Sequence, residues 1–271
     1  FGKEMAIRMP VRDLFKLKET VNTNLVDGPD AIWDIWMIKT EEEIKRIKFI
    51  CSIASDAYNS LPSKLAIGDT EREAVNKLKI DILNRGADSV PFMPGISGVG
   101  GVSQIVCGPT NRTLNDGDIL FIDTGSTFDG YFCDFDRNFA FGSVNDNVKK
   151  AYEASWNALT QGIQIAKPGK KCSDIYKSMN EILIEAGSAG NGIGRMGHGF
   201  GLQLTEPPSI MQNDNTMLEA GKTLAIEPVY EFKSGNMLVQ EEDIVITKFG
   251  NEIITKRSSK QIPIIKWMKN W

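Results

Sequence analysis

One histidine and four carboxylates are the residues of this chain whose types suit metal chemistry. His198 is the only histidine among 271 residues, and it lies between two glycines. Glycine permits close approach of the backbone, so a histidine in this setting has few structural uses beyond that of a hydrogen-bonded core or loop residue. One imidazole with several carboxylates makes a hard, oxygen-rich ligand set for two metal ions. The candidate metal ligands are Asp123, Asp134, His198, Glu227 and Glu242.

The two aspartates belong to a predicted β-hairpin. Asp123 ends the apolar run 119–122, and Asp134 follows eleven residues later on the expected returning strand. A hairpin would place both carboxylates side by side. Adjacent carboxylates repel each other unless a cation neutralises them. The alternative is a pair of exposed strand-end aspartates, and the apolar flanking residues argue against it.

The two glutamates also lie at strands. Glu227 ends the apolar segment 224–226, and a buried carboxylate there is costly unless it is paired or bound to a metal. Along residues 239–246, the period-2 alternation of a strand groups Glu242 with Gln240 on one face. We expect that face to meet the site. Glu241 then faces solvent, and Asp243 on its face is structural.

The elements that must position these side chains occur twice in the same order. Capping boxes at Thr40 and Thr70 predict two helix starts, because a Glu follows each threonine by three residues. Helices are predicted at about 10–22, from Thr40 to near Pro62, from Thr70 to Gly86, and at about 146–165 and 173–186. Strands are predicted at 118–123, 131–141, 199–205, 222–229 and 237–247. Two halves of helix, helix and strands could pack about a pseudo-two-fold axis, with the site between them.

A glycine-rich stretch precedes the first predicted strand. Its glycines are Gly95, Gly98, Gly100 and Gly101. A phosphate-binding loop needs a strand before it, a helix after it and a basic residue. None of this context is present, so we predict an ordinary loop.

Composition excludes several classes of protein. The net charge is −4, which gives no nucleic-acid footprint. No apolar run reaches 18 residues and no signal-peptide pattern is present, so we expect a cytoplasmic protein that does not span a membrane. The four scattered cysteines are expected to be free thiols.

The chain begins at Phe1 rather than Met. We therefore expect residues 1–38 to be a linker that follows an absent N-terminal domain, and residues 39–271 to form the catalytic domain. The apolar content of 41% in 271 residues is sufficient for one large core or two fused halves.

Taken together, the motifs resemble metallopeptidase family M24, which contains methionine aminopeptidase, Xaa-Pro aminopeptidase, prolidase and creatinase. The resemblance covers about residues 38–250 and is greatest to the creatinase/prolidase branch. The residues that carry it are Asp123-Thr124-Gly125, Gly130-Tyr131, Asp134-Phe135-Asp136-Arg137, Gly197-His198-Gly199-Phe200-Gly201, Glu206-Pro207-Pro208, Ile226-Glu227-Pro228 and Glu242-Asp243.

This resemblance implies an α/β (α+β) pita-bread fold, with two pseudo-symmetric halves around a central metal cleft. It implies two divalent ions (Mn, Fe, Co or Zn), with Asp134 and Glu242 bridging them. It gives Glu227 the catalytic role of relaying a proton, and Arg137 a structural role beside a buried carboxylate. It also implies a homodimer, because creatinase-like relatives pair through the N-terminal domain.

Two positions depart from the family pattern. Family peptidases carry two further histidines that bind substrate and stabilise the intermediate. The corresponding positions here are Val106 and Thr205, which we expect to line the substrate pocket. Threonine can donate a hydrogen bond but carries no charge at neutral pH, and valine can do neither.

Three functions therefore remain open. The first is a dinuclear metallohydrolase that cleaves an amide, most simply an Xaa-Pro dipeptide. The second is a metal-dependent enzyme on a small zwitterion, such as an ectoine or creatine hydrolase or a dimethylsulfoniopropionate lyase, and the two missing histidines favour it. The third is a catalytically inactive binding module, which the complete ligand set disfavours.

Overall fold

The computed structural model describes residues 9–21, 30–190 and 192–267. Two helix pairs and two main sheets alternate along the chain, as the repeat in the sequence predicts. The helices are α1 (Val11–Thr20), α2 (Asp30–Trp36), α3 (Glu41–Ser60), α4 (Glu71–Asn84), α5 (Asp146–Ile165) and α6 (Cys172–Glu185), with a short 3₁₀ helix, η1 (Leu61–Ser63), after α3.

The helix starts follow local sequence signals. Both predicted capping boxes are present: the Thr40 and Thr70 side chains accept hydrogen bonds from the backbone N–H groups of Glu43 and Glu73, whose carboxylates accept in return. Such caps satisfy backbone donors that the first helical turn leaves unpaired. The predicted helices end within about two residues of the observed ones.

The sheet of the first half has six strands. They are β1 (Ser89–Phe92), β2 (Gly95–Val99), β3 (Asp118–Phe128), β4 (Tyr131–Phe132), β5 (Phe135–Phe141) and β13 (Ile264–Ile265). The long strand β3 pairs with β1, β2, β4 and β5, and β13 adds to β5 in parallel. Strand β3 therefore holds Asp123 rigidly at the middle of this sheet.

The sheet of the second half has five strands in the order β12-β11-β8-β6-β7. They are β6 (Gly197–Gly199), β7 (Glu206–Ser209), β8 (Thr223–Ile226), β11 (Glu242–Ile246) and β12 (Asn251–Ile253). A separate ribbon consists of β9 (Val229–Glu231) and β10 (Met237–Val239). His198 lies on β6, beside the strand that leads to Glu227.

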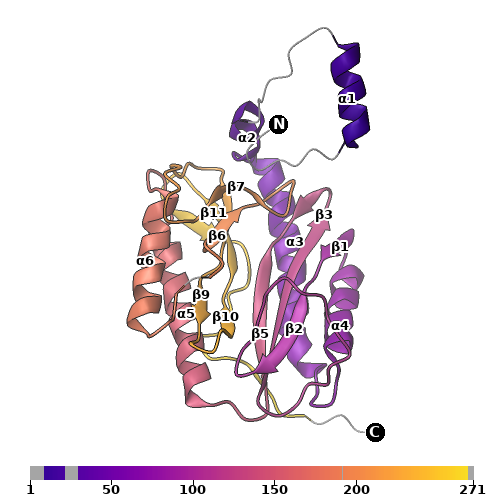
Figure 1. Ribbon diagram of the computed structural model, residues 1–271, viewed down its shortest axis with the longest axis vertical. Helices are drawn as coiled ribbons and strands as arrows, with labels where there is room; N and C mark the ends of the chain where they lie inside the picture. The colour runs from indigo at the N-terminus through magenta and orange to yellow at the C-terminus, as the bar shows by residue number, and fades with distance from the viewer. Residues whose placement is uncertain (1–8, 22–29, 191, 268–271) are drawn as a thin grey trace.

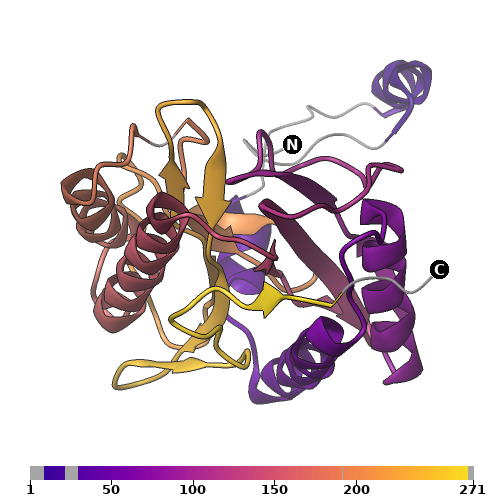
Figure 2. The same ribbon diagram turned by 90° about the horizontal axis from the view of Figure 1, so that it is seen from below.

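Each half buries its own apolar core. In the first, residues of α3 and α4 pack on one face of β3 and β5, through side chains such as Leu78, Ile122 and Phe139. In the second, α5 and α6 pack against β8 and β11, through Met179 and Ile244 among others. Figures 1 and 2 agree in showing α5 and α6 on one side of the molecule, α4 on the other and the strands between them.

Two predictions for the strands are wrong. The glycine-rich stretch is partly a strand, since Gly95–Val99 forms β2 and pairs with β3 throughout. A side chain at Gly95 would overlap with Val75 of α4, so glycine is what permits this close packing of helix and strand. The predicted strand 199–205 ends at Gly199, and the chain pairs again only from Glu206.

Two other expectations hold within the described residues. All four cysteines are free thiols, three of them buried and Cys107 half-buried. No helix in the described part of the chain is long and apolar enough to cross a membrane.

Candidate metal centre

The carboxylates of the first half lie on one face of the sheet. Asp123 is paired directly with Asp136 in the antiparallel ladder between β3 and β5. Asp134 comes immediately before β5, two residues from Asp136. Ile122 and Phe139 point to the opposite face, where α3 and α4 cover them. The alternation of the strands therefore directs the aspartates away from the helices and toward the second half.

His198 brings the second half to these carboxylates. Its Nε2 atom lies 3.4 Å from Asp134 Oδ2 and 3.7 Å from Glu227 Oε1. Its Nδ1 atom is 2.9 Å from the carbonyl oxygen of Gly199, to which only a protonated nitrogen can donate. A neutral ring with hydrogen on Nδ1 leaves the Nε2 lone pair facing two carboxylates, which is the form of histidine that binds metals.

Close packing explains why glycines flank this histidine. Gly197 has φ 141°. A side chain there would overlap with the carbonyl oxygen of Ala225, and one at Gly199 with that of Pro207. Only glycine lets β6 approach both neighbours at the height of the imidazole.

Glu241 completes the group, in place of the expected Glu242. Donor atoms of Asp134, His198 and Glu241 all lie within 4.8 Å of one another. The prediction that Glu241 faces solvent is wrong, because its exposed fraction is only 3%. Across the sheet, His198, Ala225 and Asp243 are in register and share one face. Glu241 belongs to that face by alternation.

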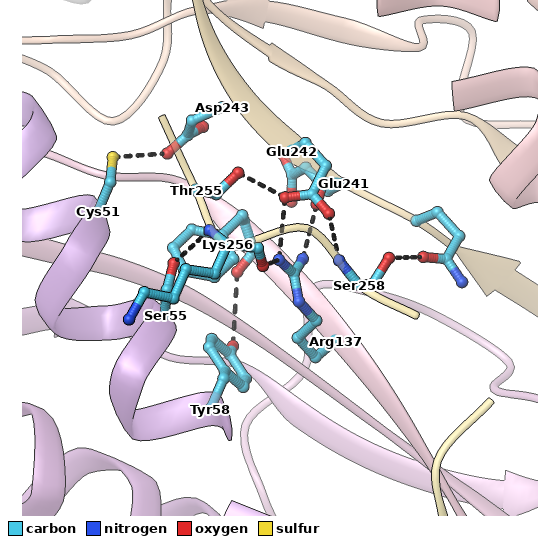
Figure 3. A network of polar contacts seen from close by, with 12 residues as sticks. Cys51, Ser55, Tyr58, Arg137, Glu241, Glu242, Asp243, Thr255, Lys256 and Ser258 are labelled. Atoms are coloured by element: carbon cyan, nitrogen blue, oxygen red, sulfur yellow. Dashed lines mark hydrogen bonds and ion pairs between the residues drawn. The ribbon is translucent and has the colours of Figure 1, made fainter. Parts of the chain in front are cut away.

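Glu242 lies in register with Ile226, on the opposite face. Figure 3 shows its carboxylate at the centre of a polar network. Arg137 Nη2 donates to Oε2 at 2.9 Å, the Thr255 hydroxyl donates to the same oxygen, and the Ser258 N–H donates to Oε1 at 2.8 Å. Both oxygens are thus occupied by protein donors, so we replace Glu242 with Glu241 in the candidate ligand set. The structural role expected for Arg137 agrees with this contact.

Asp243 links the two halves through hydrogen bonds to Asp134 and Cys51. Its Oδ2 accepts hydrogen bonds from the Asp134 N–H at 3.0 Å and from the Cys51 thiol at 3.3 Å. It is fully buried. This contact positions Asp134, and it agrees with the structural role expected for Asp243.

Burial raises the pKa values of the acids throughout the group. The pKa of Asp123 rises to about 7 because of burial, and that of Glu227 to about 7 because of burial and the charge of Asp123, against the opposing effect of Arg195. The pKa values of Asp134 and Glu241 rise well above their usual range, through burial first and Asp123 next. Without a cation these groups cannot all be charged together.

The pKa of His198 shifts in the opposite direction. Burial and the nearby Arg195 lower its pKa to about 3, so the imidazole is neutral at physiological pH. Arg195 Nε lies 3.7 Å from Glu227 Oε1.

The donor set fits divalent metal ions. It consists of carboxylate oxygens and one neutral imidazole, which suit ions such as Mn²⁺, Fe²⁺, Co²⁺ and Zn²⁺. Within the described residues, the buried Oδ1 atom of Asp123 has no hydrogen-bond partner. An acceptor left bare in a buried acidic group is what a cation would satisfy.

Val106 and Thr205 are both exposed, Val106 by 72%. The loop of Val106 is held near Asp123, since Gly95 N–H donates to the Cys107 carbonyl at 3.0 Å and Asp123 N–H to the Pro94 carbonyl at 3.1 Å. Thr205 precedes Glu206, which is in register with Gly199 beside the histidine. Their place in a substrate pocket stays a prediction.

Sequence reasoning missed Glu241 and Asp136 as members of this region. Asp136 is 1% exposed, and its pKa is raised well above the usual range by burial and by Asp123. The alternation Asp134-x-Asp136 on a strand was a usable signal, because it places both carboxylates on one face. For Glu241, the period-2 alternation of the strand separates two faces but does not show which of them meets His198.

Known proteins resemble this chain in sequence. The profile of metallopeptidase family M24 matches residues 45–248. An Xaa-Pro dipeptidase of Pyrococcus furiosus is 32% identical over 229 residues, covering 84% of this chain and 65% of the relative. An uncharacterized peptidase of Bacillus subtilis is 30% identical over 248 residues, covering 90% of this chain and 69% of the relative. The chain thus spans about two thirds of the length of these relatives.

Solved structures agree in fold. The prolidase from Pyrococcus furiosus superposes with a TM-score of 0.87 at 28% identity, covering 93% of this chain and 75% of that one. The prolidase from Pyrococcus horikoshii gives a TM-score of 0.87 at 29% identity, covering 94% and 74%. These neighbours confirm the pita-bread fold. The profile match and the relatives together show that the chain belongs to metallopeptidase family M24.

Proposed function

We propose that this chain is the catalytic part of a metal-dependent hydrolase that cleaves an amide bond, most simply that of an Xaa-Pro dipeptide. The observation that carries the proposal is the buried group of Asp134, His198 and Glu241, in which an imidazole lone pair faces carboxylates. Relatives named as Xaa-Pro dipeptidases support the substrate class.

Five residues would hold two divalent ions: Asp123, Asp134, His198, Glu227 and Glu241. Asp134, His198 and Glu241 would form the centre of this set, because their donor atoms all lie within 4.8 Å of one another.

Bound divalent ions would supply Lewis acidity, which lowers the pKa of water and polarises a carbonyl group. The chain's own residues set the proton chemistry. Glu227 would accept a proton from the attacking water and return it to the leaving nitrogen. Arg195 at 3.7 Å would stabilise the charged form of Glu227. His198 would stay neutral and take no proton.

The second candidate is a non-peptidase reaction on a small zwitterion. The observation that favours it is the presence of Val106 and Thr205 where peptidases of the family carry histidines. A substrate carboxylate or tetrahedral oxyanion would lose two donors there, and each such donor is typically worth about 10²–10³ in rate.

A turnover screen separates these candidates. Protein loaded with Mn²⁺, Co²⁺ or Zn²⁺ would be offered Xaa-Pro dipeptides beside ectoine, creatine and dimethylsulfoniopropionate, with Glu241→Gln as the inactive control. Metal-dependent cleavage of dipeptides supports the first candidate, and turnover of a zwitterion alone supports the second. Metal binding without any turnover would favour a binding module and contradict both.

We further propose that the protein is a cytoplasmic homodimer, with residues 1–38 as a linker to an N-terminal domain. The chain spans about two thirds of the length of the Xaa-Pro dipeptidases that it resembles. The described part of the linker includes α1, which has no buried residue.

A further inference from the structure

Asp136 is a buried carboxylate that the ligand set above does not use. It lies directly opposite Asp123 in the ladder between β3 and β5 and is only 1% exposed. Directly opposed residues of an antiparallel pair point to the same face, with their Cβ atoms about 4.5–5.5 Å apart. Asp136 therefore projects to the same side as Asp123, at the inner edge of the candidate metal centre.

The side chain of Asp136 lacks the donors that a buried carboxylate needs. Within the described residues, Oδ2 has no hydrogen-bond partner. Oδ1 has only the Asn138 Nδ2 group at 3.4 Å, which is long for a hydrogen bond. The neighbouring Arg137 donates to the backbone carbonyl of Asp136 and to Glu242 rather than to this carboxylate.

Asp123 also has a carboxylate oxygen without a hydrogen-bond donor. Its buried Oδ1 atom has no partner among the described residues either. Two carboxylates directly opposite each other destabilise a sheet, and a bare buried acceptor adds a desolvation cost. A cation shared by Asp123 and Asp136 would satisfy both oxygens and remove the repulsion.

We propose that Asp136 is a further ligand of the metal centre and binds the same ion as Asp123. The inference rests on the proposed metal centre and extends it by one residue. It would bring the centre to five carboxylates and one imidazole. More oxygen donors at one ion favour hard cations, so this position should prefer Mn²⁺ to Zn²⁺.

The test is a titration of metal-free protein with Mn²⁺, in which the electron paramagnetic resonance signal reports free Mn²⁺. We expect wild type to bind two ions. Asp136→Asn keeps the shape of the side chain but removes its charge. It should weaken the binding of one ion by about tenfold or more and leave the binding of the other unchanged. Asp136→Thr, a second neutral variant, should have the same effect on metal binding. It provides the test if the Asp136→Asn protein does not fold.

Thermal unfolding without metal gives an independent readout. Asp136→Asn removes a carboxyl group that is costly to bury without a cation, so the melting temperature of the metal-free protein should rise while the gain on adding Mn²⁺ falls. Asp118→Asn is the matched control. It is about equally buried, on the neighbouring strand β3, but is paired with Arg112 at 2.7 Å, so its metal-free melting temperature should fall and both ions should bind as in wild type.

The outcomes are distinguishable. Folded Asp136 variants that bind both ions with wild-type affinity would overturn the role of Asp136 and leave the metal centre intact. Wild type that binds no Mn²⁺, Co²⁺ or Zn²⁺ would overturn the proposed metal centre and this inference with it.

Discussion

Glu241 and Glu242 are adjacent in the chain, but their carboxylates lie in different surroundings. Glu241 joins Asp134 and His198, whereas protein donors occupy both oxygens of Glu242. The period of a strand assigns neighbours to opposite faces. Ligation and support of the fold are therefore divided between two glutamates that sequence alone cannot tell apart.

We predict opposite effects for the two amide substitutions. Glu241→Gln should leave the metal-free fold intact and weaken metal binding by about 10–100-fold or more. Substitution of residues that only hydrogen-bond to metal ligands already has an effect of this size. Glu242→Gln should leave Arg137 without its counter-charge and destabilise the protein by about 3 kcal/mol. Isothermal titration with Mn²⁺ and urea unfolding would measure both. Loss of metal binding in Glu242→Gln alone would reverse the assignment.

The shifted acids also predict how stability depends on pH. In metal-free protein, Asp123 and Glu227 have pKa values of about 7 when folded, against ordinary values of 3.8 and 4.5. The folded state then binds more protons than the unfolded state between those limits, so stability falls as pH rises through this window. His198, lowered from 6.5 to about 3, acts in the opposite sense but is a single group.

The metal-free protein should therefore melt at a lower temperature at about pH 8 than at about pH 5.5. Saturating Mn²⁺ should remove this difference, because bound cations replace the protons. Differential scanning calorimetry at both pH values checks the prediction. A metal-free melting temperature that rises from pH 5.5 to pH 8 would contradict it.

At the scale of elements, a glycine of the first half packs against a leucine side chain of the second half. Gly125 on β3, two residues after Asp123, has no room for a side chain, because a Cβ atom there would overlap with Leu204. Leu204 belongs to the segment between β6 and β7 that also carries Thr205. The glycine thus sets how closely this segment of the second half approaches the strand that carries Asp123.

We predict that Gly125→Ala destabilises the protein by about 1–3 kcal/mol through overpacking. Adding Leu204→Ala should recover part of the loss by making space. Gly250→Ala is the control, because a Cβ atom there meets nothing within 4 Å. Urea unfolding measures all three variants, and equal losses for Gly125→Ala and Gly250→Ala would refute the packing argument.

A buried ion pair fixes the start of α3 against the second half. Lys39 Nζ lies 2.6 Å from Glu206 Oε2, and the two side chains are 2% and 0% exposed. Burial lowers the pKa of Lys39, and Glu206 opposes this effect. Removal of one partner leaves an uncompensated charge. The pair therefore links Lys39, two residues before α3, to β7, next to Thr205.

At the scale of the whole molecule, we expect substrate choice to depend on Val106 and Thr205, the two positions without histidine. We predict that wild type cleaves Xaa-Pro dipeptides weakly and that the double variant Val106→His with Thr205→His cleaves them at least about 10²-fold faster, since each histidine restores a donor. Steady-state kinetics with Mn²⁺ measure this. Wild-type turnover near an ordinary enzyme rate of about 10 per second would show that the histidines are dispensable.

The oligomeric state of the protein is also a property of the whole molecule. Val11 and Phe15 of α1 are 63% and 56% exposed, although both are apolar. We predict that the protein is a homodimer. Light scattering at micromolar concentration tests this, and a monomer mass would contradict it.

Local signals in the sequence determined most helices of the described residues and the kinds of chemistry, although they did not predict α2. Capping boxes, helical periodicity and terminating glycines act within a few residues, so the helix bounds could be predicted closely. The residue types of Asp123, Asp134, His198 and Glu227 were also sufficient to predict an oxygen-rich metal centre between two similar halves.

The tertiary structure decided what depends on pairing between distant segments. It placed Glu241 rather than Glu242 beside His198, made Gly95–Val99 a strand and set Asp136 opposite Asp123. Each of these depends on strand register or on which face meets the other half. A shift of one residue moves every side chain to the other face, and only the packed sheets select the register.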